Sequence, residues 1–158
     1  MTLYTYSLGG DYGLTDPVEF NIGPNVLVED VLDTLGKFLS KNYFYRYGSG
    51  DLTNIKIEAT NLTNISTPTR DVRIGVINLI DPDNTCMRTF FQGSAGGRET
   101  ECQIFAPFMQ PHLNPPLLDG LVLLYNGELL TEMDHVNFEG INIPRFVDVA
   151  VRWALKEK

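Results

Sequence analysis

The chain has 158 residues, of which 43% are hydrophobic and 20% charged, so it is long enough for one globular domain with a proper core. Its formal net charge of -8 repels nucleic-acid phosphates and anionic lipids, which argues against nucleic-acid binding and membrane docking. The N-terminus lacks a basic region followed by an apolar stretch, and no run approaches the roughly 18 apolar residues of a membrane span. We therefore expect synthesis in a cytoplasm.

The N-terminal third of the chain is predicted to form two strands and a helix. Residues 2–8 and 17–23 alternate apolar and polar side chains, as short strands do. From residue 25 the apolar spacing changes to the period of an amphipathic helix, with Asn25 as its N-cap. The apolar positions of this helix are Val28, Val31, Leu32, Leu35, Phe38 and Leu39.

The predicted helix runs into a dense aromatic segment. Tyr43, Tyr45 and Tyr47 stand next to the Gly-Ser-Gly sequence of residues 48–50. Such a cluster can form a platform for a sugar or a protein partner. A hydrophobic lid where a helix rejoins a sheet is the more common arrangement.

From residue 52 onward the pattern is that of strands. Residues 54–60 and 71–79 are predicted to be two strands of one sheet. Their apolar sides are Ile55, Ile57 and Ala59 in the first strand, and Val72, Ile74 and Val76 in the second. The polar insert of residues 61–70 is interpreted as the corner between them, with polar side chains that satisfy turn backbone groups. Its two glycosylation sequons, at Asn61 and Asn64, are expected to be unused.

A second hairpin is predicted around the glycine-rich sequence "QGSAGGRE". The flanking sequences "TCMRTFF" and "ECQIFAPF" read as its strands, and residues 93–97 as its flexible tip. Cys86 and Cys102 would then stand opposite each other, either as a disulfide or as two small buried side chains.

The remaining segments predict turns and further strands. "DPDN", residues 81–84, is a turn signature, and residues 110–116 form a proline-rich, extended connection. Asn126-Gly127 lies between two apolar runs, which is the strongest hairpin signal in the chain. Residues 145–158 alternate with period two and are predicted to be a closing strand, with a helix as the alternative.

No motif identifies a chemical reaction. His112 and His135 have no ligand spacing around them, and neither cysteine has a histidine close in sequence to serve as its base. "DPDN" has no distal glutamate to complete a calcium loop. We therefore expect a protein that is not an enzyme and that needs no cofactor or metal.

Between Ile55 and Leu130 the chain has, in order, the polar corner "TNIS", the strand "VRIGVIN" and the late hairpin "LLDGLVLLYNGELL". This order of features resembles β-sandwich domains of bacteriophage virion proteins. The resemblance covers about half of the chain and carries no catalytic residues. It implies a structural component of a phage tail, neck or capsid surface, located in the virion after synthesis in the host cytoplasm.

The sequence thus predicts a mainly β (α+β) fold, a single-domain antiparallel β-sandwich over residues 1–158. The strand–helix segment of residues 1–50 is expected to pack on this sandwich. The expected partners are protein neighbours in a homo-oligomer or a hetero-assembly, without direct nucleic-acid or membrane contact. The candidate interaction residues are Tyr43, Tyr45, Tyr47, Gly93, Ser94, Gly96, Gly97, His112, Pro115 and Pro116. The alternative function is a carbohydrate- or peptide-binding module that uses the tyrosines.

Overall fold

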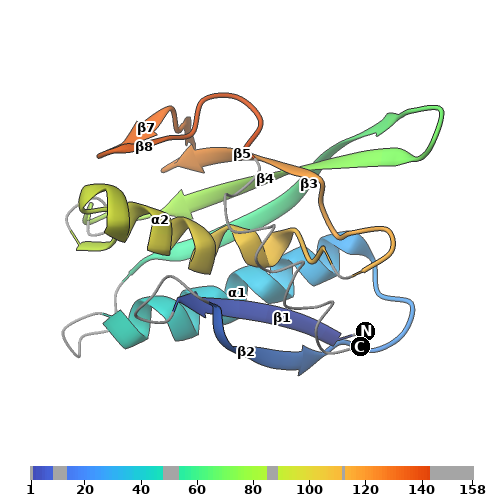
Figure 1. Cartoon of the computed structure of the whole chain (residues 1–158), viewed down its shortest axis with the longest axis horizontal. Coiled ribbons are helices and arrows are strands. Elements are labelled where there is room, and N and C mark those ends of the chain that lie inside the picture. Colours follow the sequence, from blue (N-terminus) through green and yellow to red (C-terminus); the bar gives the residue numbers. More distant parts are fainter. Residues whose placement is uncertain (1, 9–13, 48–53, 85–88, 112, 143–158) are drawn as a thin grey trace.

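The computed structural model describes residues 2–8, 14–47, 54–84, 89–111 and 113–142 (Figure 1). Their strands are β1 (Thr2–Leu8), β2 (Leu14–Asn21), β3 (Lys56–Ser66), β4 (Asp71–Ile80), β5 (Gly120–Tyr125), β6 (Glu128–Leu129), β7 (Glu132–Met133) and β8 (Val136–Asn137). Their helices are α1 (Val28–Tyr47), α2 (Gly93–Ile104) and the short 3-10 helix η2 (Ala106–Phe108).

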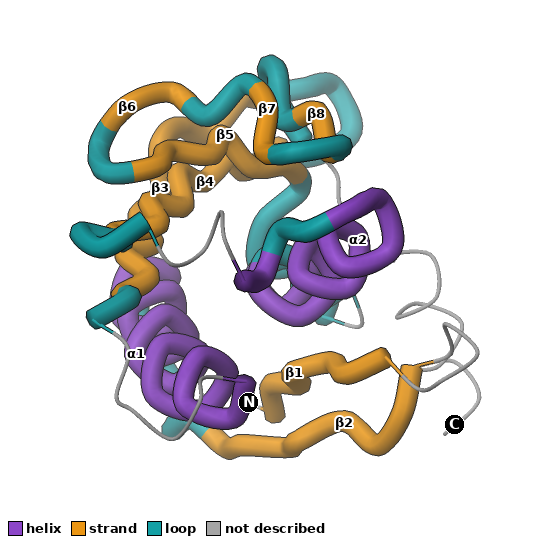
Figure 2. The backbone as a smooth tube through the Cα atoms, turned by 90° about the vertical axis from the view of Figure 1, so that its left-hand side faces the viewer, coloured by secondary structure: helices purple, strands orange, loops and turns teal. Residues whose placement is uncertain are grey.

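The elements form three layers. A four-stranded sheet in the order β3-β4-β5-β6 lies on one side, and the antiparallel β1–β2 ribbon lies on the other. Helices α1 and α2 lie between the two (Figure 2). The predicted mixed α+β class is confirmed. The described residues do not confirm a sandwich, because it is helices that cover the inner face of the large sheet.

One pairing corrects the expected antiparallel arrangement. β4 pairs with β5 in parallel, with Ile74 opposite Gly120 and Leu79 opposite Tyr125. Parallel neighbours need a long crossover, and here α2 and η2 lie within it. The β3–β4 and β5–β6 pairs are antiparallel hairpins.

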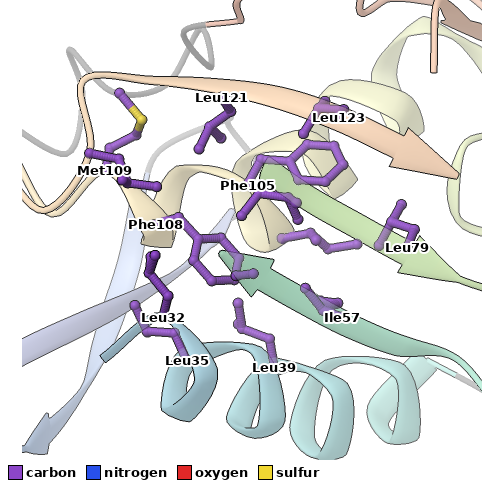
Figure 3. Close-up of a cluster of buried hydrophobic side chains, with 14 of the residues drawn as sticks. Leu32, Leu35, Leu39, Ile57, Leu79, Phe105, Phe108, Met109, Leu121 and Leu123 are labelled. Atoms are coloured by element: carbon purple, nitrogen blue, oxygen red, sulfur yellow. The ribbon is translucent and has the colours of Figure 1, made fainter. Parts of the chain in front are cut away.

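Helix α1 was predicted well, because its apolar stripe is long and regular. Val31, Leu32, Leu35 and Leu39 are buried, and the leucines point toward Ile57 and the crossover (Figure 3). The predicted N-cap was wrong. Asn25 lies in a turn with a φ of 63°. The Val31 N–H in the first turn of α1 donates to the Leu27 carbonyl at 3.1 Å, so Leu27 and not Asn25 occupies the N-cap position.

The second predicted hairpin was wrong, because residues 93–104 form helix α2. The helix carries Phe105 at its C-terminal end, and this ring packs with Phe91 and Phe138 at centroid distances of 6.2 and 5.6 Å. Apolar contacts of this kind override the poor helix propensity of glycine. Cys102 therefore lies on a helix and not on a hairpin strand, while Cys86 lies outside the described residues.

The predicted corner was also placed wrongly. β3 continues through both sequons to Ser66, so only residues 67–70 connect it to β4. The Asn126-Gly127 hairpin is confirmed, with φ values of 51° and 84° at its two turn residues. The expected strand at the C-terminus falls outside the described residues.

Candidate interaction site

The outer end of the β3–β4 hairpin projects beyond the sheet as an arm, defined here as residues 63–73 (Figure 1). The third strand, β5, begins at Gly120, which lies opposite Ile74. Beyond Ile74, β4 has only β3 as a neighbouring strand, and Asn64 to Ser66 of β3 pair with Arg73 to Asp71 of β4. Residues 63–71 are all exposed.

Side-chain hydroxyls close the tip of the arm. The Thr67 N–H donates to the Arg70 carbonyl at 3.1 Å, and the Thr67 hydroxyl accepts from the Arg70 N–H at 3.2 Å. Below this turn, the Ser66 hydroxyl donates to the Asp71 carboxylate at 2.8 Å. The "STPTRD" sequence thus replaces a glycine-based turn with a turn that its own side chains hold together.

Asp119 clamps the base of the arm to the rest of the sheet. Its N–H donates to the Arg73 carbonyl, its Oδ2 accepts from the Arg73 N–H, and its Oδ1 accepts from Arg70 Nη2, at 2.8, 2.8 and 2.6 Å. Asp119 thus continues the backbone hydrogen bonding along β4 and also binds the side chain of Arg70. The Asp119 side chain is 12% exposed and the Arg70 side chain 48%, so the carboxylate of this ion pair is shielded from water while the guanidinium remains accessible to it.

The same contacts set the ionisation of the clamp. Partial burial alone raises the pKa of Asp119, but the hydrogen bonds from Arg70 and from the Arg73 N–H, together with both positive charges, outweigh it. The pKa of the carboxyl is therefore below its ordinary value. The pKa of Arg70 is raised by the same contact. The clamp stays ionised at neutral pH.

A polar cluster joins the carboxyl ends of the parallel strands β4 and β5. The Asp81 side chain is 1% exposed and accepts a 2.7 Å hydrogen bond from the Tyr125 hydroxyl. The Asn126 carboxamide accepts from the Asp81 N–H and donates to the Asp81 carbonyl, at 2.7 and 3.2 Å. These bonds fix the "DPDN" turn against the Asn-Gly turn. Among the described residues, no group of three or more His, Cys, Asp or Glu side chains could hold a metal ion.

The structure separates the predicted interaction residues. Tyr43, Tyr45 and Tyr47 belong to the last turns of α1, where the structure describes the backbone but not the side chains. Pro115 and Pro116 belong to the loop that leads to β5, and this loop lies at the opposite end of the molecule from the last turns of α1 (Figure 1). His112 falls outside the described residues. That loop is not extended, because the Leu117 N–H returns to the Met109 carbonyl at 3.1 Å.

The predicted glycine-rich tip is instead the start of helix α2, and its first N–H is hydrogen-bonded to another part of the chain. Gly93, Ser94, Gly96 and Gly97 all belong to α2. The Gly93 N–H donates to the carboxylate of Asp134. Gly97 is buried, and a Cβ added there would come within 2.5 Å of Val136 Cγ2. The glycine therefore permits close packing of helix on β8, and these residues do not form the predicted flexible tip.

Sequence reasoning missed the arm as a candidate site. The available signal was Ile65, which continues the alternation of β3 beyond Asn61 and is 48% exposed in the structure. The asparagines and threonines around it suggested a corner, since these residues favour turns. Nothing near Asp119 in the sequence pointed to its partner Arg70, which lies in another strand connection.

Comparisons with protein-family models, curated proteins and solved structures give no match to this chain. No helix among the described residues is long and apolar enough to cross a membrane.

Proposed function

We propose that this protein is a structural, non-enzymatic component of a phage-like particle, and that it assembles with neighbouring subunits through the β3–β4 arm. The observation that carries the proposal is the arm itself. It extends past the third strand, is exposed from residue 63 to residue 71, and presents the large apolar side chain of Ile65 to solvent. The virion setting is supported by the resemblance of the 55–130 region to virion domains.

The internal bonds of the arm suit a role in recognition. A flexible loop would lose conformational entropy when it docks on a neighbour, which weakens binding. Here the turn bonds of Thr67 and the clamp of Asp119 order the arm before contact. A preorganised two-stranded arm can also present its backbone edge to a strand of a neighbour, which is a recurrent mode of recognition.

Sedimentation velocity over a concentration series, with negative-stain microscopy, tests this proposal. The wild-type chain is expected to form regular oligomers. A variant in which residues 65–72 are replaced by Asn-Gly keeps a short hairpin and is expected to lose the largest assemblies. Thr69→Ser keeps the arm length and serves as the control.

The result that would overturn the proposal is a folded arm-shortened variant whose assemblies match those of the wild type. A wild-type chain that is missing from particles of its native source would contradict the virion setting.

A further inference from the structure

The four-stranded sheet has an outer face, defined here as the side that points away from α1 and α2. Ile57, Leu79, Leu121 and Leu123 are buried and point toward the helices (Figure 3). Because side chains alternate along a strand, their neighbours point to the opposite side. The cross-strand register places Val76 beside Val122, and Leu124 beside Leu129, on that outer face.

The outer face is apolar over β4, β5 and β6 except for Asn78, whereas the first part of β3 contributes the polar side chains of Lys56, Glu58 and Thr60. Its central apolar residues are Val72, Ile74, Val76, Ile80, Val122 and Leu124, which are half-buried except for the buried Ile74. Four large hydrophobic side chains are strongly exposed among the described residues, and three of them belong to this face. They are Ile65, Leu129 and Ile141, at 48, 57 and 58% exposure. The Ile141 side chain lies over Gly120 on this face. A Cβ added at Gly120 would lie 2.6 Å from Ile141 Cγ2 and 3.2 Å from Ile74 Cδ1.

The charge on this face differs from that of the chain. The register places only two charged side chains on the outer face among the described strand residues, Lys56 and Glu58 of β3. They have opposite sign, so the face is neutral, whereas the whole chain has a net charge of -8. Two copies brought together through this face would therefore avoid the repulsion that their other surfaces impose.

We propose that two copies of this chain pack outer face to outer face about a two-fold axis. The inference rests on the proposed assembly role and names one partner for it, a second copy. In a two-fold interface the same patch meets itself, so Lys56 of one copy can approach Glu58 of the other. Two twisted sheets pack in this way about 10 Å apart with an angle of about 30° between their strands. The sandwich expected within one chain would then form between two chains.

The size of the face suits a dimer. β3, β4, β5 and β6 have 11, 10, 6 and 2 residues. At about 3.3 Å per residue and about 4.8 Å between strands, the face measures on the order of 450 Å² in each copy, or about 900 Å² for the pair, before side-chain relief is added. Side-chain relief brings this value to the roughly 1,000 Å² at which specific interfaces begin.

Sedimentation velocity and light scattering on charge variants test the dimer. The smallest species that the wild-type chain forms at micromolar concentration is expected to have twice the monomer mass of 17.7 kDa. The double variant L129K/I141K buries four lysines in the pair and is expected to raise the dissociation constant at least 100-fold. Both positions are more than half exposed, so the monomer fold should tolerate the change. L27K is the matched control, because Leu27 is 67% exposed but precedes α1.

A second measurement shows whether the face is covered. Methyl groups of Val76, Val122 and Leu124 should be shielded from a soluble paramagnetic probe in the wild type and become accessible in L129K/I141K. A monomeric wild type overturns the proposal, whether these methyl groups are open to the probe or are shielded by the same chain. A dimer that L129K/I141K leaves intact, or that L27K disrupts equally, also overturns it.

These results are separable from the test of the proposed function. Loss of large assemblies on arm shortening, with a mass unchanged by L129K/I141K, would keep the proposed function and reject the face-to-face dimer. A dimer that dissociates in L129K/I141K, together with assemblies that arm shortening does not change, would keep the face-to-face dimer and reject the proposed role of the arm.

Discussion

At the scale of single residues, Gly36 shows why an unfavourable helix residue is retained. A Cβ at this position would lie 2.6 Å from the Ile57 carbonyl oxygen, so α1 approaches β3 more closely than any side chain allows. One turn later, the Ser40 hydroxyl accepts from the Ile57 N–H at 2.8 Å and donates to the Gly36 carbonyl at 2.7 Å. The helix thereby satisfies one donor on the free edge of β3.

We therefore predict that Gly36→Ala destabilises the protein. Alanine is favoured over glycine in a helix by about 1 kcal/mol, but the clash with backbone costs about 1–3 kcal/mol, so a net loss of about 1 kcal/mol is expected. Gly96→Ala is the control, because the nearest atom to its added Cβ is 3.8 Å away and the variant should be stabilised. Urea unfolding measures both. Stabilisation by Gly36→Ala would contradict the close contact.

Tyr125 offers a second prediction at this scale. Its hydroxyl lies 2.7 Å from the buried Asp81 carboxyl and 3.1 Å from Asn84 Oδ1. Tyr125→Phe removes this donor from a buried acceptor and should lower the free energy of unfolding by about 1–3 kcal/mol. Tyr125→Phe in an Asp81→Ala background, which has no side-chain acceptor at position 81, is the comparison. If the substitution costs equally with and without the Asp81 carboxyl, then this hydrogen bond does not stabilise the fold.

At the scale of elements, regular periodicity predicted structure wherever local and tertiary preferences agree. β1 matches the predicted range of residues 2–8, and α1 was found from its apolar stripe. The helix α2 was missed, because its glycines signal a turn while its stability comes from distant partners such as Val136. Likewise, β4 carries apolar residues on both faces, and only the structure shows that Ile77 and Leu79 face the core.

The arm was missed for a related reason. The residues that stabilise it are polar and far apart in the chain, so neither periodicity nor spacing reveals them. The pairing of Arg70 with Asp119 depends on β5 lying beside β4, a parallel contact that the sequence pattern does not indicate. The tyrosine cluster, by contrast, was predicted from local composition alone, and it stays a prediction because the structure does not describe its side chains.

The clamp makes the stability of the arm depend on pH. Because the folded pKa of Asp119 is below its ordinary value, the clamp stabilises the protein fully above the unfolded pKa of about 3.9. This contribution is lost as the pH falls through the folded pKa. At pH 7, Asp119→Asn should lower the free energy of unfolding by about 1 kcal/mol, from the weakened hydrogen bonds. The difference from the wild type should shrink in acid.

Urea midpoints between pH 2.5 and pH 7 measure this effect. Asp33→Asn is the control, since its partner Lys37 is 77% exposed and the pair lies on the surface of α1. A difference between the wild type and Asp119→Asn that stays constant across this range would show that the carboxylate charge is not involved.

At the scale of the whole molecule, one hydrophobic cluster connects residues from Leu3 of β1 to Phe138 beyond β8. We expect a single cooperative unfolding transition, because this cluster is continuous across the layers. If two copies associate through the outer face, the transition midpoint should also rise with protein concentration in the wild type and not in L129K/I141K. Circular dichroism during urea titration at several concentrations measures both. Two separate transitions would contradict the single core.

The parallel pairing of β4 with β5 also has a kinetic consequence. The β1–β2 and β3–β4 hairpins form from neighbouring residues, whereas β5 cannot join β4 until the intervening crossover has closed. Contacts between distant segments form slowly, because the chain must first lose the entropy of the loop between them. We therefore expect the β3–β4 hairpin to form early, and its edge toward β5 to stay open to other chains until β5 arrives. During synthesis, this interval is when the chain is most exposed to misassembly.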